Sequence, residues 1–400
     1  MKKPSLYELI KTAFYIGAVG YGGPAILVLM KKIFVLEKKW ISEKEFMNSL
    51  SLAQVLPGAA GVSIMGYIGF KLHKLWGGIL APILFIMPAT IVMFILAWAY
   101  FKFGNLAFIQ SLFAGLGALV VALLINATSI LSKSVFKKIT YLDWKGVLIS
   151  LVTFAGIFFL KLNAIWLILL SGLFGFIFFY FTHEFEDVKA KGGEVLLVES
   201  GTLNRDTLSI KDYAPVFIVI LFFLSGLIVP DLRNIISAFA GIGTFSFGGG
   251  FAAIPLIQHQ VVVVHNWLSV KEFIDGIALG QVTPGPVFIT ATFIGYHVAG
   301  LAGAVFATLA IFTPSLVAMI LLADIHSRIQ NLKIVKVIIK GILSGFIGLL
   351  LAVSLLFAFK SLFNWQTWMI FLMAIGWMMI LKKNSLWALL GTIVLSLLIF

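Results

Sequence analysis

The feature that most constrains the fold is a succession of apolar segments that fills nearly all of the 400-residue chain. Most of these segments are about 16–26 residues long, which suits helices that cross a hydrocarbon core of about 30 Å. Charged residues make up only 11% of the chain, whereas a soluble domain has about 25%. Because a bilayer cannot solvate open backbone groups, the sequence predicts an all-α polytopic membrane protein with about 9–13 membrane segments.

The chain contains two copies of the same motifs. Residues 40–58 align with residues 267–285, and ten of the 19 positions are identical. Further matches occur in the same order, and they pair Gly22, Gly23, Gly69, Gly77 and Pro88 with Gly248, Gly249, Gly295, Gly303 and Pro314. The sequence therefore predicts an internal duplication, which is a common way to build membrane proteins from two homologous halves.

A polar stretch separates the two copies. Residues 183–213 hold seven acidic and four basic side chains, so they are predicted to be a linker. The predicted units are an N-terminal repeat over residues 1–182, this linker, a connecting transmembrane segment over 214–234 and a C-terminal repeat over 235–400.

An odd number of membrane crossings between the copies predicts an inverted repeat. In one topology all seven segments cross. In the other, the two motif-bearing segments of each copy are re-entrant and five segments cross. We favour the second topology because it places the loop 31–44, which carries five lysines, on the cytoplasmic side with most other basic residues. Both topologies place the N-terminus and the linker in the cytoplasm, with the chain in the cell membrane.

Several classes of function are disfavoured by what the chain lacks. The net charge of +13 is typical of cytoplasmic loops that face anionic lipid, so we expect a lipid bilayer and no nucleic acid as partner. The chain has no cysteine, and we find neither metal-ligand spacing, nor a Ser/His/Asp constellation, nor a phosphate loop followed by lysine. We therefore expect no enzymatic activity, no cofactor and no metal. Glu45 and Glu272, equivalent in the two copies, are predicted to be solvated or to start helices, and the alternative is a role in gating or coupling.

Each copy has a first break that is rich in glycine. It runs from Gly17 to Pro24 in the first copy and from Gly243 to Gly250 in the second. Each glycine lowers helix stability by about 1 kcal/mol relative to alanine, and Pro24 suits the first turn of a helix that resumes after a break.

The second break of each copy contains proline and follows a glutamine. It reads Gln54-Val-Leu-Pro57-Gly58 in the first copy and Gln281-Val-Thr-Pro284-Gly285-Pro286 in the second. Proline cannot sit inside a regular helix. Four half-helix N-termini are therefore predicted to point into the middle of the protein.

The broken helices indicate a preference for anions. Free N–H groups and the positive ends of helix dipoles attract negative charge, and the breaks carry no Asp or Glu. The alternative interpretation is that Gly and Pro serve packing and kinks and that the glutamines bond between helices. The predicted substrate-binding residues are Gly22, Gly23, Pro24, Gln54, Pro57, Gly58, Ser63, Ser246, Gly248, Gly249, Gly250, Gln281, Thr283, Pro284, Gly285, Pro286 and Thr290.

These motifs resemble those of the chromate ion transporter (CHR) family. The resemblance rests on residues 21–24, 40–58 and 69–88 and on their copies 247–250, 267–285 and 295–314. It implies a long member with two homologous halves that exports chromate, and also sulfate-like oxyanions, across the cytoplasmic membrane. The first copy departs from the family pattern at Ala59, where proline is usual, and the second departs at Gly250.

The resulting hypothesis is a secondary transporter that exports an inorganic oxyanion by alternating access. The dianion would sit between the paired breaks, held by N–H groups that include those of Gly58 and Gly285. The alternatives are a passive anion channel, a membrane-embedded enzyme or lipid-handling protein, and a cation-coupled transporter of another solute. Whether the chain forms a homodimer stays open. Proton coupling also stays open, because no buried acid stands out in the sequence as a carrier.

Overall fold

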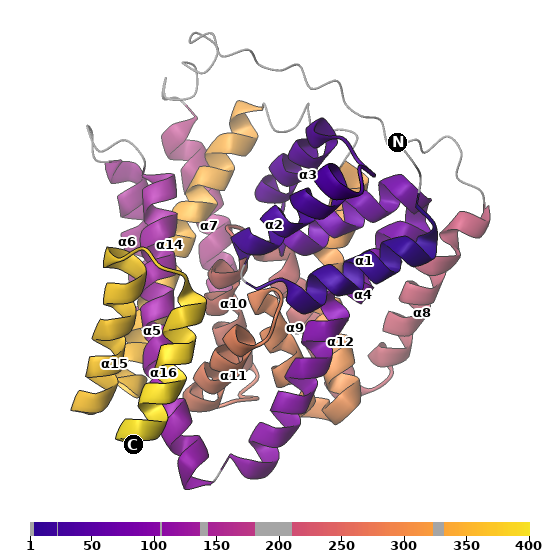
Figure 1. Ribbon diagram of the computed structural model, residues 1–400. Coiled ribbons are helices and arrows are strands. Elements are labelled where there is room, and N and C mark those ends of the chain that lie inside the picture. Colours follow the sequence, from indigo (N-terminus) through magenta and orange to yellow (C-terminus); the bar gives the residue numbers. More distant parts are fainter. Residues whose placement is uncertain (1–3, 22, 105, 137–142, 181–209, 323–331) are drawn as a thin grey trace.

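The computed structural model describes residues 4–21, 23–104, 106–136, 143–180, 210–322 and 332–400. Within these residues the regular elements are helices, apart from one isolated β-bridge, which confirms the predicted all-α class (Figure 1). The helices of the first half are α1 (Leu6–Val19), α2 (Gly23–Lys31), η1 (Lys32–Glu37), α3 (Glu43–Val55), α4 (Ala60–Phe103), α5 (Ala107–Val135), α6 (Trp144–Phe158) and α7 (Ala164–Phe179).

The second half repeats the main helices of the first in the same order, with some short elements added. Before it come η3 (Ile210–Tyr213) and α8 (Ala214–Leu227). The repeat consists of α9 (Pro230–Phe245), η4 (Gly250–Ala253), α10 (Ile254–Gln258), η5 (His259–Val264), α11 (Val270–Val282), η6 (Val287–Ile289), α12 (Thr290–Leu322), α14 (Lys333–Ser361), α15 (Trp365–Ile375), η7 (Gly376–Ile380) and α16 (Ser385–Ile399). The added short elements are η4, η6 and η7. The helix α9, the counterpart of α1, begins before the boundary drawn at residue 235. Most of the predicted linker 183–213 lies outside the described residues.

The helices α3 and α11 start in the same way. Ser42 and Glu45 form a capping box at the start of α3, and Ser269 and Glu272 form the same box at the start of α11. In each box the serine side chain accepts a backbone N–H and the glutamate side chain accepts the N–H of the serine. This finding confirms the predicted helix-starting role of both glutamates.

The helices α4 and α12 are each folded back on themselves. Non-helical residues interrupt them at equivalent places, His73 and Lys74 in α4 and Ala299 and Gly300 in α12, with nearly equal backbone angles. The two arms of α4 pack so closely that a Cβ atom at Gly69 would lie 2.1 Å from the carbonyl oxygen of Gly77. Glycine is required here because two backbones touch.

The two halves interlock by exchanging partners. The helix α14 packs against α6 and α7 of the first half, and α5 packs against α15 and α16 of the second. Hydroxyl groups join α6 to α14, since Ser150 donates to the carbonyl of Ser344 over 2.7 Å and Thr153 donates to that of Gly345 over 3.1 Å. The helices α5, α6, α7, α14, α15 and α16 thus pack largely against helices of the opposite half.

The equivalent helices α5 and α14 run antiparallel where they pack together (Figure 1). Gly117, in the first half of α5, faces Ser361 at the end of α14. Leu131, near the end of α5, and Leu343, in the first half of α14, both face Gly248. These two matching helices therefore point in opposite directions.

Helix length separates two kinds of segment. Among the described residues, four segments are long and apolar enough to cross a membrane: α4, α5, α14 and Val287–Leu322, which joins η6 and α12. By contrast, α1 has 14 residues and α3 has 13, so each spans about 20 Å at 1.5 Å per residue. The segments that carry the break motifs are thus shorter than a hydrocarbon core of about 30 Å.

Candidate functional site at the paired helix breaks

The structure confirms a break in each predicted first-break segment, but the breaks are shorter than predicted because Gly17 and Gly243 lie inside α1 and α9. The helix α1 ends at Val19 and α2 begins at Gly23, whereas α9 ends at Phe245 and η4 begins at Gly250. Gly248 and Gly249 have φ angles of +89° and +95°, a region open to glycine and strained for other residues. Gly22 lies outside the described residues, and only the backbone is described for Gly23 and Pro24.

The second breaks are also confirmed, and their geometry is the same in both halves. Gly58 and Gly285 both have a φ angle of +104°. The residues before the two prolines, Leu56 and Thr283, are extended, because proline disfavours helical geometry in the preceding residue. Each break thus ends one helix and aims the next one in a new direction.

Two hydrogen bonds tie the breaks of one half to those of the other. The N–H of Gly58 donates to the carbonyl of Ser246 over 2.7 Å, and the N–H of Gly285 donates to the carbonyl of Gly20 over 2.9 Å. Tyr21 and Gly285 also form the isolated β-bridge. The sequence offers the two glycine N–H groups to an anion, but in this conformation carbonyl oxygens of the opposite half already accept them.

Contacts within each half complete the assembly. A Cβ atom at Gly250 would lie 3.1 Å from Cβ of Val287, and one at Gly61 would lie 3.4 Å from the side chain of Ile26. Together with the crossing hydrogen bonds, these contacts join all four breaks. We call residues 20–21, 56–59, 246–249 and 283–286 the break cluster.

The helices that leave the second breaks have uncapped starts. Ala59 precedes α4 and Pro286 precedes η6, and neither residue provides a side-chain hydrogen bond to the first turn. The first N–H groups of a helix have no partner inside the helix. These two starts therefore present amide hydrogens of the type that binds anions.

The predicted hydroxyl groups are buried, but most are engaged locally. Ser246, Thr283 and Thr290 donate to backbone carbonyls three or four residues earlier, over 2.5, 3.1 and 2.9 Å. Their protons are thus not free for a ligand, although their oxygens can still accept. Ser63 is also buried, at 1% exposure.

The two equivalent glutamines differ. Gln54 is exposed, whereas Gln281 is partly buried. Nε2 of Gln281 is a buried side-chain nitrogen with no hydrogen-bond partner among the described residues. The interhelical hydrogen bond that was the alternative for this glutamine is therefore absent at its nitrogen. A buried donor without a partner costs about 1–3 kcal/mol, and an anion beside it would recover that cost.

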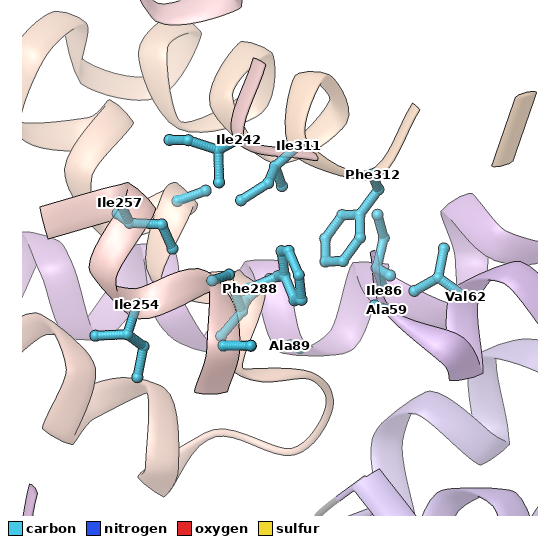
Figure 2. Close-up of a cluster of buried hydrophobic side chains, with 14 of the residues drawn as sticks. Ala59, Val62, Ile86, Ala89, Ile242, Ile254, Ile257, Phe288, Ile311 and Phe312 are labelled. Carbon is cyan, nitrogen blue, oxygen red and sulfur yellow. The ribbon is translucent and has the colours of Figure 1, made fainter. Parts of the chain in front are cut away.

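Apolar side chains fill the space between the halves at the break cluster. Figure 2 shows Phe288 and Phe312 among Ile86, Ala89 and Ile311. The two phenylalanine rings are tilted, with centroids 5.9 Å apart, and both residues are 1% exposed or less. The structure is thus packed shut at this level.

A separate cavity of about 530 Å³ lies between α8, α9 and α12. Its lining is mostly apolar and includes Phe223, Ile236 and Pro314. Because a charged ligand needs polar partners when it leaves water, the chemistry of this cavity does not suit an anion. The break cluster remains the candidate site.

One buried acid escapes sequence reasoning. Asp275 of α11 is 3% exposed, and the hydroxyl of Tyr100 in α4 donates to it over 2.8 Å. The aligned block holds a signal for it, because the equivalent residue of the first copy is Asn48. This is one of two positions in the block where the copies differ in charge, and the other pairs Glu43 with Val270.

Comparison with known proteins decides the family. The family model described as chromate transporter matches residues 7–176 and 233–397. The chain belongs to the chromate transporter family. This is a membrane transport family and not an enzyme family, and with the apolar helices of the structure it makes the chain a multi-pass membrane protein.

Relatives match both halves of the chain. An uncharacterized transporter of Methanocaldococcus jannaschii is 32% identical over 99% of this chain and 95% of its own. The chromate transport protein of Cupriavidus metallidurans is 30% identical over 95% of this chain and 90% of its own. The probable chromate transport protein of Synechococcus elongatus is 29% identical, with 93% and 89% covered. No solved structure matches the chain.

Proposed function

We propose that the protein is a secondary transporter that exports an inorganic oxyanion across the cytoplasmic membrane. Chromate is the proposed substrate, because two of the relatives that match most of the chain are named for chromate transport. A sulfate-like dianion has the same charge and shape and is expected to compete. We propose that the anion binds at the break cluster.

The observation that carries this proposal is that Nε2 of Gln281 has no hydrogen-bond partner within the part of the chain that the structure describes. Gln281 lies in the last turn of α11, directly before the break at residues 283–286. The uncapped starts of α4 and η6 supply further N–H donors, and no carboxylate lies in the break cluster to repel an anion. A site built from donors without negative charge favours a dianion over a cation.

We further propose that the two halves form an inverted repeat that alternates around this site. The antiparallel packing of α5 and α14 supports the inversion. The shortness of α1 and α3 supports the topology in which the break-bearing segments are re-entrant. We also propose that the N-terminus and the 183–213 linker lie in the cytoplasm. A membrane potential that is negative inside would drive an anion outward, at about 2.3 kcal/mol per charge per 100 mV.

Counterflow in proteoliposomes tests the site. Vesicles loaded with unlabelled chromate should accumulate labelled chromate through the parent protein. Because a hydrogen bond to a charged group contributes about 1.5–3 kcal/mol, Gln281→Ala should raise the half-saturating chromate concentration by about 10–100-fold. An excess of sulfate should slow the uptake.

Two variants serve as comparisons. Gln110→Ala removes an exposed glutamine of α5, outside the break cluster, and should leave the counterflow unchanged. Gln54→Ala should have a smaller effect than Gln281→Ala, because Gln54 is exposed in this conformation. If folded Gln281→Ala protein transports like the parent, the proposed site is wrong. If chromate moves without counterflow, the protein is a channel.

A further inference from the structure

We propose that Asp275 is a proton-carrying site that couples anion movement to a proton gradient, with Tyr100 as its hydrogen-bond partner. The inference rests on the proposed transport function and extends it, because it supplies a coupling ion. It concerns a residue outside the break cluster and outside the predicted binding set.

The first support is the placement of the acid. Asp275 lies in the middle of α11 and is 3% exposed. An ionised carboxylate has about four acceptor positions, and among the described residues the hydrogen bond to it comes from the hydroxyl of Tyr100. A charged acid inside a membrane protein is costly and is retained where it serves transport or proton movement.

The second support is the apolar environment of the Asp275–Tyr100 pair. The ring of Tyr100 makes edge contacts with Phe101, Phe113 and Phe293, at centroid distances of 5.1, 5.0 and 5.3 Å. These rings come from α4, α5 and α12, and they enclose the pair in apolar material. A change of charge at Asp275 is therefore felt strongly, because little solvent is present to screen it.

Other titratable groups near the three phenylalanine rings and Asp275 come from α11 and α12. Lys271 and Glu272 precede Asp275 by one turn of α11 and act on it electrostatically. From α12, His297 and Tyr296 lie against Phe101, with ring centroids 4.6 and 6.2 Å from it. The helix α14 contributes an apolar ring, that of Phe357, which packs edge-on against Phe273 of α11.

The third support is a physical connection from Asp275 to the break cluster. The helix α4 touches α11 and the break that follows it at three levels. Tyr100 bonds Asp275 at one end, Met93 lies 3.7 Å from a Cβ atom built at Gly280, and Ala89 lies 3.1 Å from one built at Gly285. The same helix therefore contacts the acid at one end and the second break at the other.

Protonation changes this connection in a defined way. The carboxylate of Asp275 takes up one proton from water on one side of the membrane and becomes a neutral carboxylic acid, and release of that proton on the other side restores the carboxylate. No other bond forms or breaks. The hydrogen bond from Tyr100 is charge-assisted in the ionised state and weaker in the neutral state. Proton uptake thus loosens α11 from α4 at the end opposite the break.

The first copy has no such group at this position. Asn48 stands where the second copy has Asp275, and an amide cannot carry a proton in this way. The proposed proton site is thus built by two halves together, with the acid from the second and the tyrosine from the first.

Proteoliposomes with the membrane potential clamped at zero test the coupling. Under an imposed pH gradient, the parent protein should accumulate labelled chromate. Asp275→Asn should lose this response while it still exchanges labelled for unlabelled chromate. Asp231→Asn removes an exposed acid in the first turn of α9, away from the Asp275–Tyr100 pair, and it should respond like the parent. A pH response of Asp275→Asn equal to that of the parent overturns the proposal.

Infrared titration of the purified protein provides a readout that does not depend on transport. The parent should show a carboxylic-acid absorption that changes with pH and that is missing from Asp275→Asn. The same titrating absorption in both proteins overturns the proposal. If the parent moves no chromate at all, the proposed function fails, and the infrared result still decides whether Asp275 binds a proton.

Discussion

At the scale of single residues, glycine holds the break cluster together for two separable reasons. Gly58 has a φ angle of +104°, and a Cβ atom there would lie 2.4 Å from Cβ of Ser315. Gly249 has a similar φ angle of +95°, but no atom of the described residues lies within 4 Å of a Cβ built there. Glycine is required at position 58 both for its left-handed backbone and because a side chain would collide with Ser315. At position 249 it is required for the left-handed backbone alone.

This contrast gives a prediction for two alanine variants. Gly58→Ala should lower the free energy of unfolding by about 1–3 kcal/mol more than Gly249→Ala, because crowding of a packed core adds to the backbone strain. Thermal unfolding of the detergent-solubilised protein measures the difference. Equal unfolding midpoints for the two variants would contradict the close approach to Ser315.

At the scale of elements, the hairpins of α4 and α12 depend on backbone contact between their arms. A Cβ atom at Gly295 would lie 2.2 Å from the carbonyl oxygen of Gly303, whereas one at Gly241 of α9 has no neighbour within 4 Å in the described part of the chain. Both glycines are helical. The two positions therefore form a matched pair that differs in packing.

Alanine should act in opposite directions at these positions. Gly295→Ala should be destabilising by about 1–3 kcal/mol, because the arms must separate. Gly241→Ala should be neutral or stabilising by up to about 1 kcal/mol, because alanine favours the helix. Denaturation in the same detergent measures both. A stable Gly295→Ala protein would mean that the arms are not in contact.

Local chemistry explains which elements could be predicted from the sequence. The breaks at residues 56–59 and 283–286 follow from proline and glycine themselves, so they were predictable, as were the helix starts at Glu45 and Glu272. The hydrogen-bond partners that come from the other half could not be predicted from the sequence. The acceptor for the N–H of Gly58 lies between α9 and η4, and Tyr100 is 175 residues away from Asp275 in the sequence. A local pattern contains no information about such pairs.

At the scale of the whole molecule, the proposed inverted repeat makes a prediction about which side of the membrane each loop faces. In the proposed topology the loop that precedes α3 faces the cytoplasm, whereas the equivalent loop that precedes α11 faces the outside. Lys38 lies in the first loop and Lys271 lies at the start of α11, and both are exposed. The chain has no cysteine, so Lys38→Cys and Lys271→Cys each introduce a single reactive site.

Labelling with a membrane-impermeant thiol reagent should modify these two cysteines from opposite sides of the membrane. Lys38→Cys should react from the cytoplasmic side, and Lys271→Cys from the outside. Total labelling after solubilisation controls for reactivity. Modification of both residues from the same side would rule out the inverted arrangement.

The crossed hydrogen bonds at Gly58 and Gly285 have a consequence for how such a molecule stays sealed. Each bond uses an amide hydrogen that an anion would also seek, and each joins opposite halves. An anion that displaces the carbonyl of Ser246 from the N–H of Gly58, or that of Gly20 from the N–H of Gly285, would accept that N–H itself. The same exchange would break the hydrogen bond between the two halves. Anion binding and separation of the two halves at this point would then occur together. Without a bound anion, both hydrogen bonds would stay intact and the pathway would stay closed.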